Sequence, residues 1–303
     1  MPPAESQSLR ASPAIATAAP KRWRRLPVDL LAMLGAFAYW GVAGLLITAV
    51  SIPLILILPC AVAKRLGRGM LHRAFRLFVR YLRATDLVHA DLDSLDALKD
   101  EHGPVVIAPN HTSLWDAVFV ISKLPQPICI MKEAILKNPF LGGGARLAGY
   151  IPNSSPAKMV KTAAAALENG GQLLLFPEGT RTRREARWIN PLRGGCALIA
   201  RRAGVPVRPV FIRSNTRFLE KGWPLWRKPE LPIRLSFELG EPVVPIEGES
   251  AHDFTRRLED IFERNLSRAH KLRRQADPRS SPLPGLEVPA SEAVAEIPPG
   301  FRL

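Results

Sequence analysis

The sequence predicts an α/β layered domain with a mainly parallel sheet flanked by helices, preceded by an N-terminal membrane-associated helical segment. Two observations carry this prediction. Strand-like and helix-like runs alternate through residues 87–270, a pattern typical of helices that cover a parallel sheet. Before them, residues 30–63 contain no Asp, Glu, Lys or Arg. With 303 residues, of which 47% are hydrophobic, the chain is long and apolar enough to bury a substantial core.

The elements of the α/β domain follow from short apolar runs and from longer runs with helical patterning. The predicted strands are Val105–Ala108, Ile128–Met131, Gln172–Phe176, Pro206–Ile212 and Ile233–Glu238. The predicted helices are Leu114–Ser122, Pro156–Leu167, Gly195–Ala203 and Ala251–Arg268.

Changes in composition predict where the domains begin and end. Residues 1–20 are rich in Ala, Ser and Pro, and residues 271–303 are punctuated by prolines, so we expect both to be disordered tails. Between the tails we expect a membrane segment with a basic amphipathic helix over 21–85, and the α/β domain over 86–270.

The uncharged stretch is too long for one straight helix confined to a bilayer. As a single helix it would extend roughly 51 Å, against a hydrocarbon thickness of roughly 30 Å. Because Pro53 disfavours helix at the residue before it, we expect a break near Ser51–Pro53. Positive residues on both sides, at 21–25 and 64–68, favour a hairpin that dips into the membrane with both ends in the cytoplasm. The alternatives are one crossing helix over 30–50 followed by an interfacial segment, or a buried helix pair of a soluble protein.

A basic amphipathic helix follows this stretch. At 100° per residue the cationic side chains of residues 65–83 fall within an arc of roughly 140°, with apolar residues opposite. An ordinary surface helix mixes both signs of charge, whereas this one has no acidic residue between Lys64 and Asp86. We therefore expect it in the headgroup layer, facing lipid phosphates with Arg65, Arg68, His72, Arg73, Arg76, Arg80 and Arg83.

Net charge and cysteine content exclude some classes of protein. The formal charge of +15 predicts an anionic partner, and its concentration beside the uncharged stretch favours membrane over nucleic acid. The three cysteines are far apart and lack CxxC spacing, which excludes a disulfide scaffold and a zinc ribbon.

The run NHTSLWD, residues 110–116, follows a predicted strand and suits the start of a helix, with Thr112 or Ser113 as its N-cap. His111 and Asp116 can meet only if the histidine lies in the turn before the helix and the aspartate lies in the first turn. Asp116 then accepts a hydrogen bond from one imidazole nitrogen and leaves the other as a general base. Because the run has no nucleophile, this base would activate a substrate hydroxyl. A capping aspartate beside a structural histidine is the alternative.

The run FPEGTRT, residues 176–182, is again an apolar strand that leads into a charged turn. Residues just after parallel strands form the usual ligand crevice of an open α/β sheet. Glu178 offers an acceptor, Arg181 offers a fork that binds anions, and Gly179 lets the backbone approach a ligand. The alternative is a surface loop with an ion pair. We expect the imidazole of His111 and the guanidinium of Arg181 to face a shared hollow at the membrane surface.

These two runs together resemble two motif blocks of the glycerolipid acyltransferase family, whose best-known members are bacterial 1-acyl-sn-glycerol-3-phosphate acyltransferases. Two further stretches are similar to the other blocks of the family. Lys132–Gly142 resembles the second block, and Val205–Val210 resembles the fourth, proline-containing block. All four occur in the family's order within residues 110–210. A non-enzymatic membrane or nucleic-acid binder would explain none of these blocks.

The resemblance implies a fatty acyl transfer to a hydroxyl of a lysophospholipid, such as 1-acyl-glycerol-3-phosphate. His111 and Asp116 would form the catalytic dyad, with His111 as the general base. The substrate-binding residues would be Glu178, Gly179, Thr180, Arg181 and Lys132, with Arg181 facing the acceptor phosphate. Pro206 and Pro209 would shape the strand beside the acyl site.

The resemblance also implies the co-substrates, partners and location of the protein. The acyl donor would be acyl-CoA or an acyl carrier protein, and no metal or bound cofactor is expected. Anionic membrane lipids and a lipid acceptor would be partners, and nucleic acid would not. We expect the protein at the inner (cytoplasmic) membrane, with its active site on the cytoplasmic side. Since the family needs no catalytic cysteine, Cys129 and Cys196 are interpreted as buried packing residues.

One departure from the family pattern affects the acceptor. Many members that act on phosphate acceptors carry an arginine after a Gly-x-Ile step, but the corresponding run Gly149–Ser155 contains none. A missing guanidinium removes a contact worth about 1.5–3 kcal/mol. Lys158 would replace it as a less specific point charge. The alternative function is therefore the same chemistry on an aminolipid, glycolipid or aryl-polyene acceptor.

Overall fold

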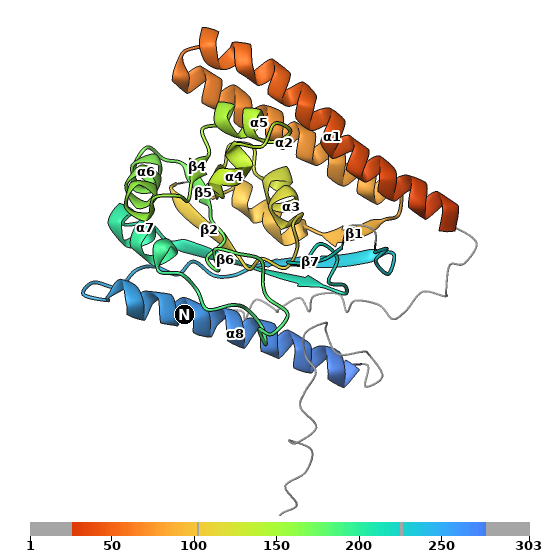
Figure 1. The fold of residues 1–303 in the computed structure, drawn as a ribbon. Helices are drawn as coiled ribbons and strands as arrows, with labels where there is room; N and C mark the ends of the chain where they lie inside the picture. Colours follow the sequence, from red (N-terminus) through yellow and green to blue (C-terminus); the bar gives the residue numbers. More distant parts are fainter. Residues whose placement is uncertain (1–25, 102, 225–226, 277–303) are drawn as a thin grey trace, which may run out of the picture.

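The computed structural model describes residues 26–101, 103–224 and 227–276 (Figure 1). The predicted tail 1–20 lies outside these residues, as does most of the predicted tail 271–303. Residues 271–276 belong instead to the last helix, α8 (Ala251–Ala276), which runs past its predicted end at Arg268.

A seven-stranded sheet forms the centre of the domain, in the order β1-β7-β6-β2-β5-β3-β4. Every neighbouring pair is parallel except β6 and β7, so the prediction of a mainly parallel sheet is confirmed. The residues of β2 are all buried, as expected for a central parallel strand. The strands are β1 (Val88–Asp91), β2 (Val105–Pro109), β3 (Ile128–Met131), β4 (Ile151–Pro152), β5 (Gln172–Leu174), β6 (Val207–Ser214) and β7 (Ile233–Leu239).

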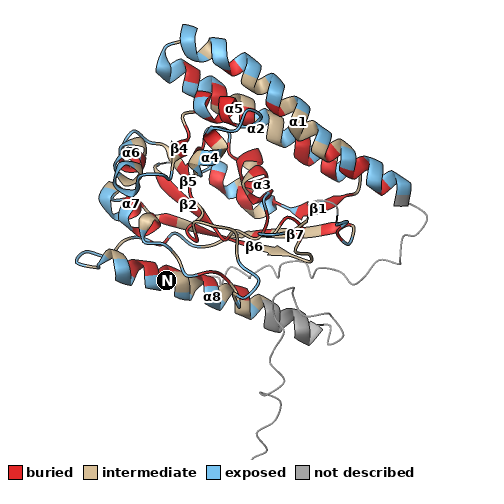
Figure 2. Cartoon of the chain, in the orientation of Figure 1, coloured by how far each residue is buried: buried red, intermediate tan, exposed pale blue. Residues whose placement is uncertain are grey.

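Helices cover both faces of the sheet, and Figure 2 shows the buried residues concentrated between the layers. One core cluster joins the sheet to α1, α2, α3 and the 3-10 helix η2. A second joins it to α6, α7 and α8 on the opposite face. The remaining bounds are α1 (Leu26–Ile57), α2 (Cys60–Ala84), η2 (Asp93–Lys99), α3 (Asp116–Lys123), α4 (Glu133–Leu136), α5 (Gly142–Leu147), α6 (Pro156–Glu168) and α7 (Gly195–Ala203).

The uncharged stretch forms most of one long helix, α1, rather than two short arms. The predicted break near Ser51–Pro53 is wrong, because α1 continues through Pro53 to Ile57. The chain turns instead at Pro59, which is the N-cap of α2 and favours extended backbone there. Tyr81 donates from α2 to a carbonyl near the start of α1, so the two helices form an antiparallel hairpin.

By length and composition alone, residues 27–57 of α1 are long and apolar enough to cross a membrane. The described part of α1 nevertheless packs along the domain for most of its length. The Gly44 position approaches the backbone of Phe140, Gly143 of α5 approaches Thr48, and Ser51 is buried. The outer face is apolar and exposed, and Leu31 is 68% exposed. Beyond Ser51 the tip of the hairpin exposes apolar side chains at Ile52, Ile55, Leu56, Ile57 and Val62.

The basic helix predicted over 65–83 lies within α2. Its apolar face packs on α3 and α5 through buried residues that include Leu71, Phe78 and Leu82. Of the predicted basic face, Arg68 donates to the carbonyl of Ala148, while Arg73, Arg76 and Arg80 are exposed. The lipid contacts predicted for these arginines stay a prediction.

Candidate active site

The loop after β2 carries the histidine, and Asn110 fixes the start of that loop. The side-chain amide of Asn110 donates to the carbonyl of Ile212 at 3.0 Å, and its oxygen accepts from the N–H of Ile212 at 2.7 Å. Asn110 is buried, so this pair continues the β2–β6 ladder by one residue through a side chain. His111 is thereby held just beyond the carboxyl end of β2.

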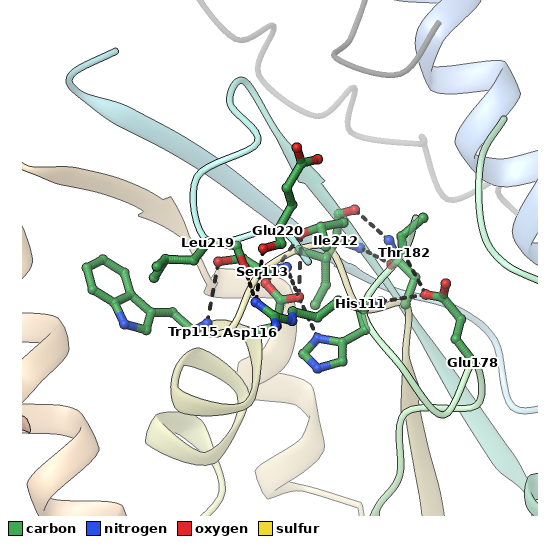
Figure 3. Close-up of polar contacts among 12 residues, drawn as sticks. His111, Ser113, Trp115, Asp116, Glu178, Thr182, Ile212, Leu219 and Glu220 are labelled. Carbon is green, nitrogen blue, oxygen red and sulfur yellow. Dashed lines mark hydrogen bonds and ion pairs between the residues drawn. The ribbon is translucent and has the colours of Figure 1, made fainter. Parts of the chain in front are cut away.

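His111 and Asp116 form the expected pair (Figure 3). Nδ1 of His111 lies 3.1 Å from Oδ2 of Asp116, and the carboxylate is fully buried. Because a carboxylate only accepts hydrogen bonds, Nδ1 carries the proton and Nε2 is left with its lone pair. Thr112 Oγ1 lies 3.4 Å from each oxygen of the same carboxylate. The predicted geometry, with histidine before the helix and aspartate in its first turn, is confirmed.

The predicted N-cap at Thr112 or Ser113 is wrong. Helix α3 begins at Asp116, and Trp115 occupies the N-cap position. The backbone N–H of Ser113 donates to Oδ2 of Asp116 at 2.7 Å, so the aspartate turns back onto the preceding loop. Ser113 Oγ instead donates to the carbonyl of Phe218 at 3.0 Å. The carboxylate therefore orders both the histidine and the loop that carries it.

The imidazole of His111 stacks on Phe176, with ring centroids 4.0 Å apart and an interplanar angle of 26°. Its side chain is 17% exposed, whereas Asp116 is 0% exposed. A partly exposed imidazole backed by a buried carboxylate has one nitrogen available to a ligand. Phe176 begins the run FPEGTRT, but nothing in the sequence indicated that its ring would stack on His111.

Glu178 is held entirely by the protein. Its Oε1 accepts from the backbone N–H of His111 at 2.8 Å and from Thr182 Oγ1 at 2.9 Å. Its Oε2 accepts from both the backbone and the side chain of Asn190, at 2.9 and 2.6 Å. Burial raises the pKa of the Glu178 carboxyl, and these hydrogen bonds oppose that rise. With both oxygens occupied and 2% exposure, the carboxylate positions the loops and is not turned toward a ligand.

The residues after Glu178 form a tight turn. Gly179 has φ +67° and donates its N–H to the carbonyl of Phe176 at 3.0 Å. The left-handed backbone is the reason that glycine suits this position. Thr180 is partly exposed on the same turn, and no hydrogen bond of its side chain is present among the described residues.

Arg181 reaches back across the site. Its Nη1 donates to the carbonyls of Leu219 and Glu220, at 2.7 and 3.1 Å. Burial lowers the pKa of the guanidinium, and the negative charge of Asp116 acts in the opposite direction. That influence requires the two groups to lie close together. In the part of the chain that the structure describes, Nε and Nη2 make no hydrogen bond, which leaves one edge of the fork for an anion.

His111, Asp116 and Arg181 are thus brought together, but none of the three is among the described residues that line the neighbouring hollow, so the expected shared hollow is not found there. The hollow found here has a volume of about 110 Å³ and is lined by the neighbours of these residues. Thr112 and Thr182 belong to its wall, as do several arginines: Arg183, Arg184, Arg187, Arg213 and Arg217. It is strongly cationic and adjoins the dyad loop through Thr112.

The remaining predicted site residues lie farther from the dyad. Lys132 follows β3, two strands from β2 at the same edge of the sheet, and is exposed. Lys158 is exposed in the first turn of α6. Pro206 accepts from the N–H of Val106, at the opposite end of β2 from His111. Pro209 pairs with Ala108 in the middle of the sheet and is buried.

Comparison with known proteins finds relatives of the part of the chain that carries this site. Residues 90–213, which include both polar loops, match the Acyltransferase family. The chain is 26% identical over 159 residues to the chloroplastic 1-acyl-sn-glycerol-3-phosphate acyltransferase BAT2 of Brassica napus, covering 50% of this chain and 46% of that protein. It is 32% identical over 127 residues to the 1-acyl-sn-glycerol-3-phosphate acyltransferase of Pseudomonas aeruginosa, covering 40% and 48%.

The matched stretch spans about half the length of these curated relatives. The crystal structure of the 1-acyl-sn-glycerophosphate acyltransferase PlsC from Thermotoga maritima has the same fold, with a TM-score of 0.54 at 19% identity. That match covers 81% of this chain and 97% of the other. The dyad loop and the glutamate–arginine loop both fall within the family match. Residues 90–213 therefore form an acyltransferase domain that is similar in sequence to the glycerolipid acyltransferases.

Proposed function

We propose that this protein transfers a fatty acyl group from an acyl thioester to the hydroxyl of a lysophospholipid, with His111 as the general base. The observation that carries the proposal is the His111–Asp116 pair, in which Nδ1 faces the buried carboxylate and Nε2 remains free to accept a proton. The names of the relatives support a lysophosphatidate as the acceptor.

In the proposed reaction, Nε2 of His111 removes the proton of the acceptor hydroxyl as its oxygen attacks the thioester carbonyl. The new C–O bond forms a tetrahedral intermediate, which collapses as the C–S bond breaks. The imidazolium then returns its proton to the departing thiolate, so that the free thiol leaves and His111 is neutral again. Asp116 stabilises the transient imidazolium through the hydrogen bond at Nδ1.

The phosphate of the acceptor would be bound by the free edge of Arg181. A guanidinium forms paired, charge-assisted hydrogen bonds with a phosphate, and Nη1 is already fixed by two carbonyls. Glu178 acts indirectly in this proposal, because it fixes the backbone of His111 and the loop that begins at Arg181. Gly179 and Thr180 shape the turn between them.

The acyl donor is proposed to be acyl-CoA or an acyl carrier protein, and the step requires no metal or bound cofactor. The proposed location is the cytoplasmic face of the inner membrane. Because α1 packs along the domain as far as Ser51, its apolar outer face and the tip after Ser51 are the parts available to a bilayer. Leu114 in the dyad loop is 51% exposed, which supports an active site close to the lipid surface.

The run Gly149–Ser155 favours a second class of acceptor. This run contains no arginine, and Ser155 occupies the N-cap of α6. Lys158, one turn later, is exposed and supplies a charge without a fork. An aminolipid, glycolipid or aryl-polyene lipid that lacks the phosphate monoester would need fewer cationic contacts at this edge of the site.

Purified enzyme in detergent micelles should be assayed with lysophosphatidate and, in parallel, with a lyso-aminolipid, a lyso-glycolipid and an aryl-polyene alcohol. Each acceptor is paired with acyl-CoA and with an acyl carrier protein, and the acylated product is identified by mass spectrometry. We expect phosphatidate as the main product. Preferential acylation of an acceptor without phosphate would show that lysophosphatidate is not the preferred acceptor. Absence of product with every pair of acceptor and donor would contradict the proposed activity.

A further inference from the structure

A second cationic hollow, of about 390 Å³, lies on the flank of α2 and is larger than the one beside the dyad. Its cationic and histidine side chains come from three elements, α2, η2 and the end of α3: His72, Arg76, Arg80, Arg83, Lys99 and Lys123. Among the described residues that line it, none is acidic. The hollow is therefore suited to an anionic group larger than a monatomic ion.

Several of these groups are held in place before any ligand binds. His72 Nδ1 donates to the carbonyl of Ile121 at 2.9 Å, and Arg83 Nη2 donates to that of Ala90 at 2.6 Å. Outside the lining, Asp96 pairs with Lys99 at 2.5 Å and with Lys123 at 2.8 Å. This one carboxylate serves two ammonium groups, so a net positive charge remains at the hollow.

The hollow is separate from the proposed acyl-transfer site. Lys123 ends α3, whereas Asp116 begins it, and a helix of this length rises about 10 Å between them. Lys99 precedes β2, whereas His111 follows that strand. The two sites thus lie toward opposite ends of β2 and α3, and the acceptor held at His111 does not occupy this hollow.

The neighbouring surface of α2 indicates what kind of anion fits. One face of α2 contacts α1 through Ala74 and Tyr81. At 100° per residue around the axis of α2, the cations that line the hollow are centred roughly 150° away from that face. Between these two faces, turned away from the domain, α2 exposes Leu66 and Leu77, the latter by 56%. Cations beside exposed leucines match an amphipathic ligand with an anionic head and an apolar body.

We propose that the hollow formed by α2, η2 and α3 binds the phosphate-bearing headgroup of an anionic membrane phospholipid that is not a substrate. The lipid would anchor the domain beside the α1–α2 hairpin. The proposal rests on the membrane attachment proposed above, and it does not depend on acyl transfer. Binding to neutral vesicles tests the attachment alone, whereas the increase caused by anionic lipid tests the hollow.

The experiment compares the full-length parent with two triple variants of equal net charge. Arg76→Gln/Lys99→Gln/Lys123→Gln removes one cation from each element of the hollow. Arg202→Gln/Arg256→Gln/Arg264→Gln removes three exposed cations from α7 and α8 on the opposite face of the sheet. Flotation is measured with phosphatidylcholine vesicles, with and without phosphatidylglycerol.

We expect phosphatidylglycerol to strengthen binding of the parent, and the hollow variant to lose about 10- to 100-fold of that gain. The matched control should keep most of it, and all three proteins should bind neutral vesicles alike. Equal losses in both variants, or no loss in the hollow variant, would overturn the proposal. It would also be overturned if the hollow variant lost affinity for an acidic acyl carrier protein or for inorganic phosphate but kept the lipid effect.

Discussion

Oε1 of Glu178 accepts a 2.8 Å hydrogen bond from the backbone N–H of His111. A carboxylate in the turn that follows β5 therefore fixes the residue that carries the proposed base in the loop after β2. The same carboxylate accepts from Thr182 and twice from Asn190, so it joins three segments of the site with four hydrogen bonds. This contact makes Glu178 a positioning residue.

Glu178→Gln should lower kcat with little effect on membrane binding. The amide replaces one acceptor oxygen by a donor, which faces donors on its neighbours, and each buried unsatisfied group costs about 1–3 kcal/mol. We expect kcat to fall about 10- to 100-fold as the loop of His111 loses its constraint. Steady-state kinetics measure this, with Glu185→Gln, an exposed glutamate, as the matched control. Unchanged kcat would show that the contact is dispensable.

The stability of the protein should depend on pH through the same carboxyl. Burial raises the pKa of Glu178 above its ordinary 4.5. Between 4.5 and the raised value the folded protein binds this proton and the unfolded chain does not, so stability falls as pH rises through that window. We therefore expect the stability of the parent relative to Glu178→Gln, measured by thermal unfolding in micelles, to decrease as pH rises through that window. A difference that grows with pH would contradict the assigned direction.

Arg181→Lys should weaken the use of phosphate acceptors. The ammonium keeps the charge but lacks the fork that holds two carbonyls with Nη1 and offers another edge to a phosphate. We expect kcat/KM for lysophosphatidate to fall about 10- to 100-fold, mainly through KM. A fall in kcat at constant KM would assign Arg181 to the loop alone.

Gly179→Ala should destabilise the turn between Glu178 and Arg181. A Cβ at φ +67° costs about 1–2 kcal/mol. It would also lie 2.6 Å from Cδ of Arg193, whose exposed side chain can move away. The unfolding temperature and kcat of Gly179→Ala should both fall. Gly248→Ala, at φ +78° in a distant loop, should lower only the unfolding temperature. Full activity of Gly179→Ala would separate the turn from the chemistry.

Only one of the three cysteines should react in the folded protein. Burial raises the pKa of the Cys129 and Cys196 thiols to about 12, whereas Cys60 is exposed at the start of α2. Maleimide should label one thiol in micelles and three after denaturation. Labelling of all three in the native protein would contradict the packing assigned to Cys129 and Cys196.

Cys60 also tests how the α1–α2 hairpin meets the membrane. If the tip dips into the bilayer, a membrane-impermeant maleimide should label Cys60 in micelles but not in sealed vesicles, from either side. The described packing of α1 along the domain favours this result. Labelling from the side opposite the domain would show instead that α1 spans the membrane.

The sequence predicted the parts of the fold that depend on local pattern. Strand Ile128–Met131 and helix Gly195–Ala203 have the predicted bounds, because the first is a short apolar run and the second ends at Gly204, which forms a left-handed C-cap. Two short strands, β1 and β4, were not predicted, since their pairing depends on distant strands. The break at Pro53 failed because one proline within a long apolar helix does not end it, whereas Pro59 at a terminus does.

The sequence predicted the contact at the centre of the candidate site but not the hydrogen bonds around it. The spacing of His111 and Asp116 allowed their contact, and the structure contains it. Hydrogen bonds between distant segments have no local signal, so the sequence did not show that Glu178 is saturated by its neighbours. Asn190 lies outside the motif blocks, and nothing in its local pattern marks it as a partner of Glu178.

The most direct test of the proposed mechanism is the turnover of His111→Ala in purified enzyme at saturating lysophosphatidate and acyl donor. Removal of a positioned general base typically costs about 10²- to 10⁴-fold. We expect kcat to fall by that factor while thermal stability and vesicle binding match the parent. A kcat within a few-fold of the parent would remove His111 from the chemistry and contradict the account.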